Sequence, residues 1–234
     1  MHPPRRLGVA VLAGGMGTRL GGAAPKPLTP ILGHPMIHYS LRVFEAIPEV
    51  SSVVVAIADT VGPLLDRALL PYPRRCYKGW VPGGPTRPES ALAALRVLEE
   101  DAPEVVLIHD AARPLVAEED VQALLAALPG HDGAFLGAPA VDTLWQVDGQ
   151  MAQEAVDRSR LVRAYTPQAF PFATVLEAYA RGLAEGFHGT DDASFVRHFG
   201  GDVVWVRGYS WNIKVTYPED VALAESILEG KGCA

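Results

Sequence analysis

A glycine-rich segment with two basic residues lies near the start of the chain, in the stretch 12–27 that reads LAGGMGTRLGGAAPKP. Glycines between a strand and a helix let backbone N–H groups approach phosphate oxygens closely. The glycines concerned are Gly14, Gly15 and Gly17. Arg19 and Lys26 can add fixed positive charge, which stabilises the negative charge that develops when a phosphorus atom is attacked. These residue types therefore predict a phosphate-handling site, and the alternative is a tight turn with two solvated basic residues.

Three known kinds of phosphate loop can be compared with this segment. The Walker pattern ends in Gly-Lys-Ser/Thr, whereas Pro27 follows Lys26 here. The dinucleotide pattern G-x-G-x-x-G has Leu20 in place of its third glycine, and no acidic residue follows about 20 positions on, which disfavours a dehydrogenase. The pattern G-x-G-x-R-(L/M), followed by a short spacer and Pro-Lys, matches throughout. In this respect the chain resembles the nucleotidyltransferases that make activated sugars and alcohols.

An acidic residue, Asp110, comes directly after the apolar run 104–108, in the hexapeptide HDAARP at 109–114. Ligands of open α/β sheets bind beyond the carboxyl ends of the strands. An aspartate at such a place can hold Mg²⁺ against triphosphate oxygens, or it can cap the segment that follows. The residues alone leave both interpretations open.

Two more polar residues occupy places where a ligand could reach them. Lys214 lies in the apolar run 213–215 and is either a phosphate anchor or a lysine that protects an edge strand from aggregation. Ser90 lies where a helix is expected to begin, so its hydroxyl can read a base edge or cap the helix. The polar segment 190–194 is interpreted as a helix cap and is not assigned to the site.

The elements that must position these residues alternate between short apolar runs and helical patterns, as βαβ units do. The expected strands are 7–13, 52–58, 104–109, 133–139 and 202–207. Apolar residues recur at helical spacing from Val121 to Leu128 and from Leu176 to Leu183, and a capping box at 216–219 is expected to open the last helix. The pattern predicts a single α/β domain over residues 1–234, with a mostly parallel, Rossmann-like sheet sandwiched by helices.

One region, at about 139–165, departs from this rhythm. Its residues 141–165 are too polar for a core strand and lack a helical period, and Asp148–Gly149 is a hairpin-turn signal. We interpret the region as a protruding β-arm. Because a hairpin buries little of its own surface, the arm is expected to pack on a second copy and to form a homodimer, the alternative being a loose surface hairpin.

The composition restricts the class of protein further. Apolar residues make up 49% of the chain and charged residues 20%, and the formal net charge of −7 disfavours nucleic-acid binding, which needs a basic surface. The two cysteines, Cys76 and Cys233, have no metal-ligand spacing. The apolar run after Arg6 fits a buried strand better than an export signal, and no run is long enough to span a membrane, so a cytoplasmic protein is expected.

HDAARP narrows the resemblance to the 2-C-methyl-D-erythritol 4-phosphate cytidylyltransferase family of the non-mevalonate isoprenoid pathway. Further segments agree with that family in the same order along the chain, and they run from the first strand to the last helix. They are PAVDT at 139–143, VDR at 156–158, TPQ at 166–168, TDDAS at 190–194 and NIKVT at 212–216. Several dispersed motifs in the right order are more specific than any one of them.

The resemblance implies a role for each matching position. Arg19 and Lys26 would stabilise the transition state, Asp110 would position Mg²⁺, and Arg158 and Lys214 would also act in catalysis. The nucleotide, CTP, would lie against Ala13, Gly14, Gly15, Gly17, Gly84, Ser90 and Asp110. The acceptor, a polyol phosphate, would be held by Arg113, Thr143, Arg158, Thr166 and Lys214. The family is homodimeric, so Thr143 and Arg158 on the arm would serve the partner's site.

The implied reaction is transfer of CMP from CTP to 2-C-methyl-D-erythritol 4-phosphate. The alternatives are a ribitol-5-phosphate cytidylyltransferase and, in a different class, a non-catalytic nucleotide-binding subunit, which would be expected to lack Lys26 or Asp110. The chain departs from the family pattern at several positions. Gly14 stands in place of the usual Ala, Pro27 in place of Gln, and Pro85 and Trp211 in place of acidic residues.

Overall fold

The structure of the protein is a computed structural model, which describes residues 6–15, 20–21 and 24–231. At its centre lie three parallel strands, β1 (Leu7–Leu12), β4 (Val50–Ile57) and β6 (Val105–Asp110), with β1 in the middle. Their side chains are buried on both faces, apart from Ser51 at the start of β4. These strands were expected from their apolar runs, because a strand covered on both faces is apolar at nearly every position.

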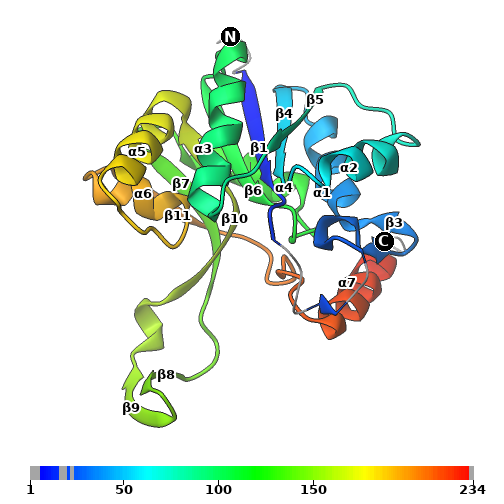
Figure 1. The fold of residues 1–234 in the computed structure, drawn as a ribbon. Coiled ribbons are helices and arrows are strands. Elements are labelled where there is room, and N and C mark those ends of the chain that lie inside the picture. The colour runs from blue at the N-terminus through cyan, green and yellow to red at the C-terminus, as the bar shows by residue number, and fades with distance from the viewer. Residues whose placement is uncertain (1–5, 16–19, 22–23, 232–234) are drawn as a thin grey trace.

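The described residues form a seven-stranded sheet in the order β11-β7-β10-β6-β1-β4-β5 (Figure 1). Its edge strands are β5 (Tyr77–Pro82) and β11 (Val203–Arg207), and β7 (Gly133–Pro139) lies next to β11. Strand β10 (Val162–Pro171) alone runs antiparallel to its neighbours β6 and β7. The mostly parallel sheet is confirmed, and β5 and β10 are additions to the predicted strands.

Helices cover both faces of the sheet and enclose two apolar layers. One face packs against α1 (Met36–Ala46), α2 (Gly62–Leu69) and α4 (Glu118–Ala127). The other face packs against α3 (Arg87–Leu98), α5 (Phe172–Ala184) and α6 (Asp192–His198), and the short 3-10 helix η3 (Glu99–Asp101) extends α3. The expected sandwich of helices around the sheet is therefore confirmed.

The last helix, α7 (Pro218–Lys231), packs on a third apolar cluster beside the small hairpin of β2 (Pro30–Ile31) and β3 (His34–Pro35). It begins where the sequence predicted, but its start differs from the expected box. The Asp220 carboxylate, rather than that of Glu219, accepts the backbone N–H groups of Thr216 and Tyr217 at 2.7 and 2.8 Å. Among the described residues, no helix is both long and apolar enough to cross a bilayer.

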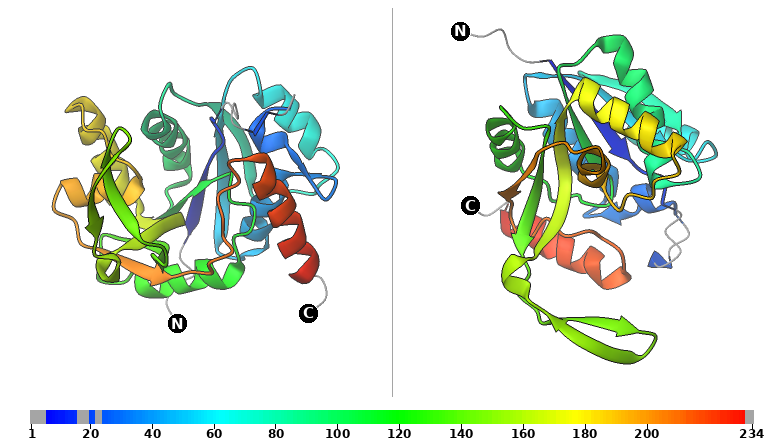
Figure 2. Two further views of the ribbon diagram at one scale, coloured as in Figure 1. Left: turned by 90° about the horizontal axis from the view of Figure 1, so that it is seen from below. Right: turned by 90° about the vertical axis from the view of Figure 1, so that its left-hand side faces the viewer.

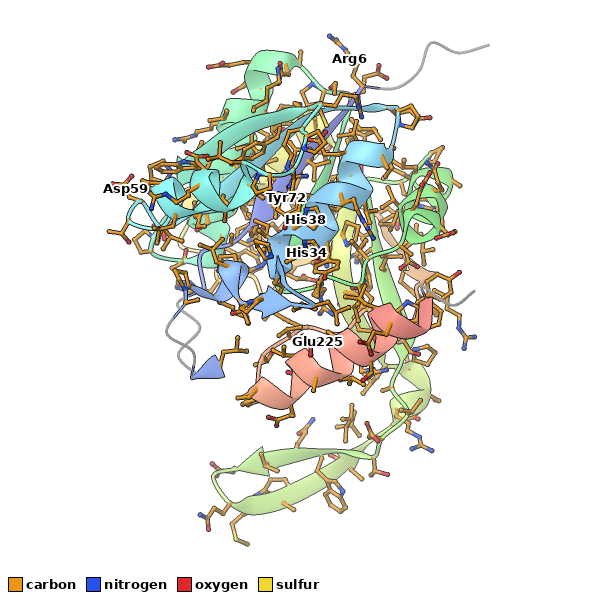
Figure 3. The ribbon with its side chains drawn as sticks, turned by 90° about the vertical axis from the view of Figure 1, so that its right-hand side faces the viewer. Arg6, His34, His38, Asp59, Tyr72 and Glu225 are labelled. Carbon is orange, nitrogen blue, oxygen red and sulfur yellow. The ribbon has the colours of Figure 1, made fainter. Side chains whose placement is uncertain are left out.

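An aromatic cluster lies beside β3 and α1 (Figure 3). The His38 ring stacks on Tyr72 with 3.8 Å between ring centroids, and His34 Nδ1 lies 2.6 Å from the Tyr72 hydroxyl. The Arg74 guanidinium donates to His38 Nδ1 at 3.3 Å. Burial, reinforced by the Arg74 charge, lowers the pKa of His38 to about 4, so this ring is neutral at physiological pH.

A hairpin of β8 (Leu144–Asp148) and β9 (Met151–Val156) projects from the body of the molecule, followed by the 3-10 helix η4 (Arg158–Arg160) (Figures 1 and 2). Its turn falls at the predicted Asp148–Gly149, where Gly149 adopts a positive φ of 55°. The projecting part is shorter than the expected 139–165, because Val162 and Arg163 already pair with β7 in the central sheet. Large apolar side chains of this hairpin are exposed, namely Val141, Leu144, Trp145, Val147 and Met151.

Candidate active site

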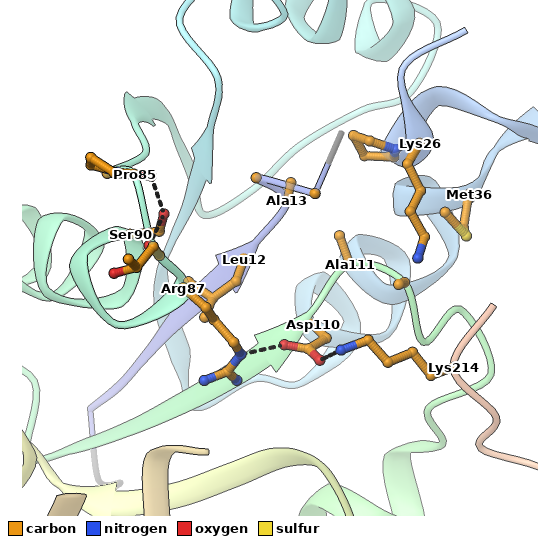
Figure 4. Close-up of a pocket in the computed structure, with 16 residues that line it drawn as sticks. Leu12, Ala13, Lys26, Met36, Pro85, Arg87, Ser90, Asp110, Ala111 and Lys214 are labelled. Atoms are coloured by element: carbon orange, nitrogen blue, oxygen red, sulfur yellow. Dashed lines mark hydrogen bonds and ion pairs between the residues drawn. The ribbon is translucent and has the colours of Figure 1, made fainter. Parts of the chain in front are cut away.

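A pocket opens at the carboxyl ends of β1 and β6, where an α/β sheet is expected to bind its ligand (Figure 4). Most of the predicted site residues in the described part of the chain line it. They are Ala13, Gly14, Gly15, Lys26, Gly84, Ser90, Asp110 and Lys214. Gly17 and Arg19 lie outside the described residues. The pocket thus gathers residues from near both ends of the chain, from Leu12 to Lys214.

The glycine-rich segment forms one wall of the pocket. Ala13 continues β1 and donates its N–H to Ala56 at 2.8 Å, and Gly14 and Gly15 follow it with exposed backbone. Lys26 begins the 3-10 helix η2 (Lys26–Leu28), which Pro25 precedes and which contains Pro27, and the Lys26 side chain points into the pocket. Open backbone and a lysine ammonium on one side of a pocket can receive a chain of phosphates.

Both oxygens of the Asp110 carboxylate have a positively charged partner. Arg87 Nε donates to Oδ1 at 3.0 Å, and Lys214 Nζ donates to Oδ2 at 2.6 Å (Figure 4). Burial alone would raise the pKa of Asp110, but the charges of Arg87 and Lys214 outweigh it and hold this pKa well below its usual range. Asp110 is therefore an anion at neutral pH and provides oxygen ligands of the kind that Mg²⁺ prefers.

Arg87 also contacts a second carboxylate, which lies deeper in the molecule. Its Nη1 and Nη2 atoms donate to the two oxygens of Asp192 at 2.7 and 2.9 Å. The Asp192 side chain is 0% exposed and accepts a further hydrogen bond from the Tyr179 hydroxyl. Burial would lower the pKa of Arg87, but Asp192 and then Asp110 raise it, so the guanidinium remains charged.

The backbone of Asp110 is held by a chain of hydrogen bonds beneath the pocket. Its N–H donates to Thr166 Oγ1 at 3.0 Å, and this hydroxyl lies 3.2 Å from His109 Nδ1. His109 Nε2 lies 3.1 Å from the Arg113 carbonyl, which can only accept, so Nε2 carries the hydrogen. Burial lowers the pKa of His109 to about 3, and the neutral imidazole accepts from Thr166 at Nδ1.

The loop before α3 forms the opposite wall of the pocket. Thr86 caps α3 in a reciprocal capping box with Glu89. Ser90 is 4% exposed, and its hydroxyl lies within hydrogen-bond distance of the carbonyls of Gly84 and Thr86, at 3.3 and 3.0 Å. Helix capping was one of the two interpretations of Ser90, and Ser90 does not cap α3. Its hydroxyl instead ties residues 84–86 to the first turn of α3.

Two residues that were predicted to bind the acceptor substrate, Thr166 and Arg113, lie beneath the pocket and are not among its lining residues. Thr166 holds the Asp110 backbone, as described above. Arg113 donates to the Asn212 carbonyl at 2.7 Å and to the Ala164 carbonyl at 3.4 Å, and its guanidinium lies 4.9 Å from the centre of the Tyr165 ring. Arg113 thus joins the segment before Lys214 to strand β10.

The two predicted residues of the arm lie away from the pocket of their own chain. Thr143 and Arg158 are both exposed, on the projecting segment visible in Figure 1. The Arg158 guanidinium donates to the Val141 carbonyl within the arm. A single chain therefore does not bring these two residues to its own Lys26 and Asp110.

Sequence reasoning missed Arg87 and Asp192. Arg87 lies in the segment 83–90 that drew attention to Ser90, and Asp192 lies in the motif TDDAS. The helix-cap interpretation of that motif is correct for Asp191, whose carboxylate accepts the Ser194 N–H at 2.9 Å. The helix-cap interpretation does not apply to Asp192. The pair of adjacent aspartates could have indicated a second role, because a helix cap needs only one of them.

The carboxyl edge of this sheet brings open glycine backbone, two lysines and an ionised aspartate into one pocket, which defines a nucleotide-handling enzyme of the nucleotidyltransferase class. A family model described as 2-C-methyl-D-erythritol 4-phosphate cytidylyltransferase matches residues 7–230. The chain belongs to this family, whose members are cytidylyltransferases.

Individual relatives agree with this assignment over nearly the whole chain. The 2-C-methyl-D-erythritol 4-phosphate cytidylyltransferase of Syntrophotalea carbinolica is 35% identical to this chain, and the aligned region covers 96% of this chain and 97% of that enzyme. That of Thermobifida fusca is 38% identical, with coverage of 97% and 95%. The crystal structure of the Thermus thermophilus enzyme of the same name superposes with a TM-score of 0.78 at 28% identity, covering 96% of this chain and 99% of that one.

Proposed function

We propose that this chain transfers CMP from CTP to 2-C-methyl-D-erythritol 4-phosphate, giving 4-diphosphocytidyl-2-C-methyl-D-erythritol and pyrophosphate, in the non-mevalonate route to isoprenoid precursors. The observation that carries this proposal is the convergence of Lys26, Asp110 and Lys214 on one pocket in a member of this family. The two substrates are polyanions that do not cross a bilayer unaided, so we place the reaction in the cytoplasm.

The proposed reaction needs no nucleophile from the protein. An oxygen of the acceptor phosphate attacks the α-phosphorus of CTP in line, and the bond from that phosphorus to the bridging oxygen breaks. Pyrophosphate leaves with the bonding electron pair. Positioning and charge stabilisation then account for most of the rate enhancement. Lys26 and Arg19 would stabilise the charge that develops on the phosphate oxygens, and Ala13, Gly14, Gly15 and Gly17 would lie along the triphosphate.

The residues around Asp110 fit a divalent cation such as Mg²⁺. Asp110 is ionised and lines the pocket. Within the described part of the chain no group of three or more histidine, cysteine or acidic residues could hold a metal by itself. The cation would therefore be held by Asp110 together with triphosphate oxygens and water, and when bound it would offset the negative charge of the triphosphate.

The base and the acceptor would occupy opposite ends of the pocket. Gly84 and Ser90 would contact the cytosine, and Lys214 would anchor the acceptor phosphate. Thr143 and Arg158 would reach the acceptor from the partner subunit of a homodimer, with Arg113 and Thr166 below them. The exposed apolar side chains of the arm support this dimer, because a hairpin that projects into water gains stability by covering them.

The test is pyrophosphate release from CTP and Mg²⁺, with 2-C-methyl-D-erythritol 4-phosphate and ribitol 5-phosphate supplied in parallel. Release with the first acceptor, and its loss in a Lys26→Ala variant, supports the proposal. Release with ribitol 5-phosphate alone overturns the acceptor. Release with neither overturns the proposed catalysis and favours a non-catalytic nucleotide-binding protein.

A further inference from the structure

The proposed reaction assigns no role to Asp192 or Tyr179. Neither residue lines the pocket in the described part of the chain, yet both are connected to it through Arg87. Asp192 receives two hydrogen bonds from the Arg87 guanidinium and one from the Tyr179 hydroxyl, and its side chain has no contact with solvent. A buried carboxylate with this set of donors has a fixed orientation.

This clamp determines how Arg87 meets Asp110. The paired contact with Asp192 fixes the plane of the guanidinium, and in this orientation its contact with Asp110 is a single hydrogen bond, from Nε to Oδ1 at 3.0 Å. A guanidinium that is free to turn binds a carboxylate through both oxygens. Asp192 thus holds Arg87 in an orientation in which the second oxygen of Asp110 is bonded to Lys214 instead.

The partner of that second oxygen is held much less firmly. Lys214 donates a single hydrogen bond to Oδ2 at 2.6 Å, and its side chain is 46% exposed on a flexible stem. The Arg87 side chain is 28% exposed and is held by two carboxylates. A ligand that enters the pocket can therefore displace Lys214 from Oδ2 far more easily than it can displace Arg87 from Oδ1.

We propose that Asp192 is a positioning residue for Asp110: by clamping Arg87 it fixes Oδ1 and reserves Oδ2 for exchange between Lys214 and a triphosphate-bound divalent cation. This inference rests on the proposed function, in which Asp110 holds that cation. Without the Asp192 carboxylate, Arg87 turns to bind both Asp110 oxygens and competes with the cation.

The test measures cation binding directly, with Mn²⁺ as the probe and without turnover. Free Mn²⁺ is followed by electron paramagnetic resonance in the presence of α,β-methylene-CTP, in which the reacting bond cannot break. Asp192→Asn is expected to raise the Kd of Mn²⁺ about tenfold or more, the size of effect that is usual when the residues that orient a metal ligand are disturbed. The matched control is Asp191→Asn, which keeps an oxygen for the helix cap and has no contact with Arg87, and its Kd is expected to stay within about twofold of wild type.

A double-mutant comparison separates this positioning role from general damage to the fold. If Asp192 acts through Arg87, adding Asp192→Asn to Arg87→Gln changes the Mn²⁺ affinity no further. Should Asp192→Asn fail to fold by circular dichroism, Tyr179→Phe replaces it, since it keeps both charges and removes only the hydroxyl donor to Asp192. A smaller increase in Kd, about two- to fivefold, is then expected.

Two results overturn the inference, and the variant Asp110→Asn distinguishes its failure from failure of the proposed function. The inference is wrong if the Mn²⁺ affinity of folded Asp192→Asn or of its replacement equals that of wild type, or if the effects of Arg87→Gln and Asp192→Asn add in full. Asp110→Asn tests the metal role itself. If Asp110→Asn weakens Mn²⁺ binding while Asp192→Asn does not, only the inference fails. If Asp110→Asn leaves Mn²⁺ binding unchanged, the proposed metal role of Asp110 fails and the inference fails with it.

Discussion

Replacing Gly84 with alanine tests how tightly the loop that faces the proposed cytosine site is fixed to α3. A Cβ atom at Gly84 would lie 2.3 Å from the Cβ of Glu89 and 3.2 Å from its carbonyl carbon, and neither atom belongs to the flexible end of a side chain. The loop must therefore move by about 1 Å to restore an ordinary contact. That movement carries the cost of overpacking, about 1–3 kcal/mol, and strains the capping box between Thr86 and Glu89, which is worth about 1 kcal/mol.

We expect Gly84→Ala to lower the free energy of unfolding by about 2–4 kcal/mol, and the Tm by about 4–16 °C for a chain of this size. The KM for CTP should rise as well, since Ser90 loses its contact with the Gly84 carbonyl. Thermal unfolding followed by circular dichroism, together with CTP titration of pyrophosphate release, measures both effects. Gly14→Ala is the matched stability control, because among the described residues its Cβ would meet the Ser90 hydroxyl alone, at an ordinary 3.6 Å. A Gly84→Ala protein as stable as Gly14→Ala would refute the steric argument.

Three further predictions concern charge, assembly and pH. Lys26→Ala should lower kcat at least about a hundredfold with an unchanged circular dichroism spectrum, because a fixed cation is lost; near-normal turnover would contradict its role. Mixing inactive Lys26→Ala and Arg158→Ala subunits should restore some pyrophosphate release, since one mixed site receives both intact residues, and heterodimers without activity would exclude a shared site. The pKa of His38 is lowered to about 4. Between pH 6.5 and pH 4 the unfolded chain therefore binds a proton at His38 that the folded chain does not bind, and the free energy of unfolding falls as the pH drops. His38→Gln should reduce this fall by about 2–3 kcal/mol in urea titrations at pH 7 and pH 4, and equal falls would contradict the assignment.

The three central strands were the simplest to predict from the sequence. Strands β1, β4 and β6 are buried on both faces, so an unbroken apolar run is sufficient to recognise them. Strand β10 has no such run, because it carries Thr166 and Gln168 into the interior. Gln168 is 1% exposed, and its amide is satisfied by Asp191 at 3.0 Å and by the N–H of Ala193 at 2.8 Å. A polar residue can be buried at low cost only when such distant partners exist, and a sequence pattern does not show them.

The candidate site was predicted wherever a short motif carries its own chemistry. The glycine segment, Lys26 and Asp110 each lie at the end of a predicted strand or in the loop that follows it. The clamp of Arg87 on Asp192 joins residues 105 positions apart. They are brought together because α3 packs against α5, which in turn packs against α6. The arm illustrates the opposite case: its turn is local and was predicted, whereas its packing on a second copy of the chain stays a prediction.

The hydrogen bonds beneath Asp110 run in one direction. The Asp110 peptide gives a hydrogen to Thr166, Thr166 gives one to His109, and His109 gives one to the Arg113 peptide. Each link therefore depends on the one before it, and residue 166 must both receive and give. Serine meets this requirement, while valine, which has nearly the same shape as threonine, breaks the row at two links. Residue 166, which is not among the described residues that line the pocket, is thus subject to a chemical constraint of its own, and the tolerance of a site to substitution does not follow from the lining of its pocket alone.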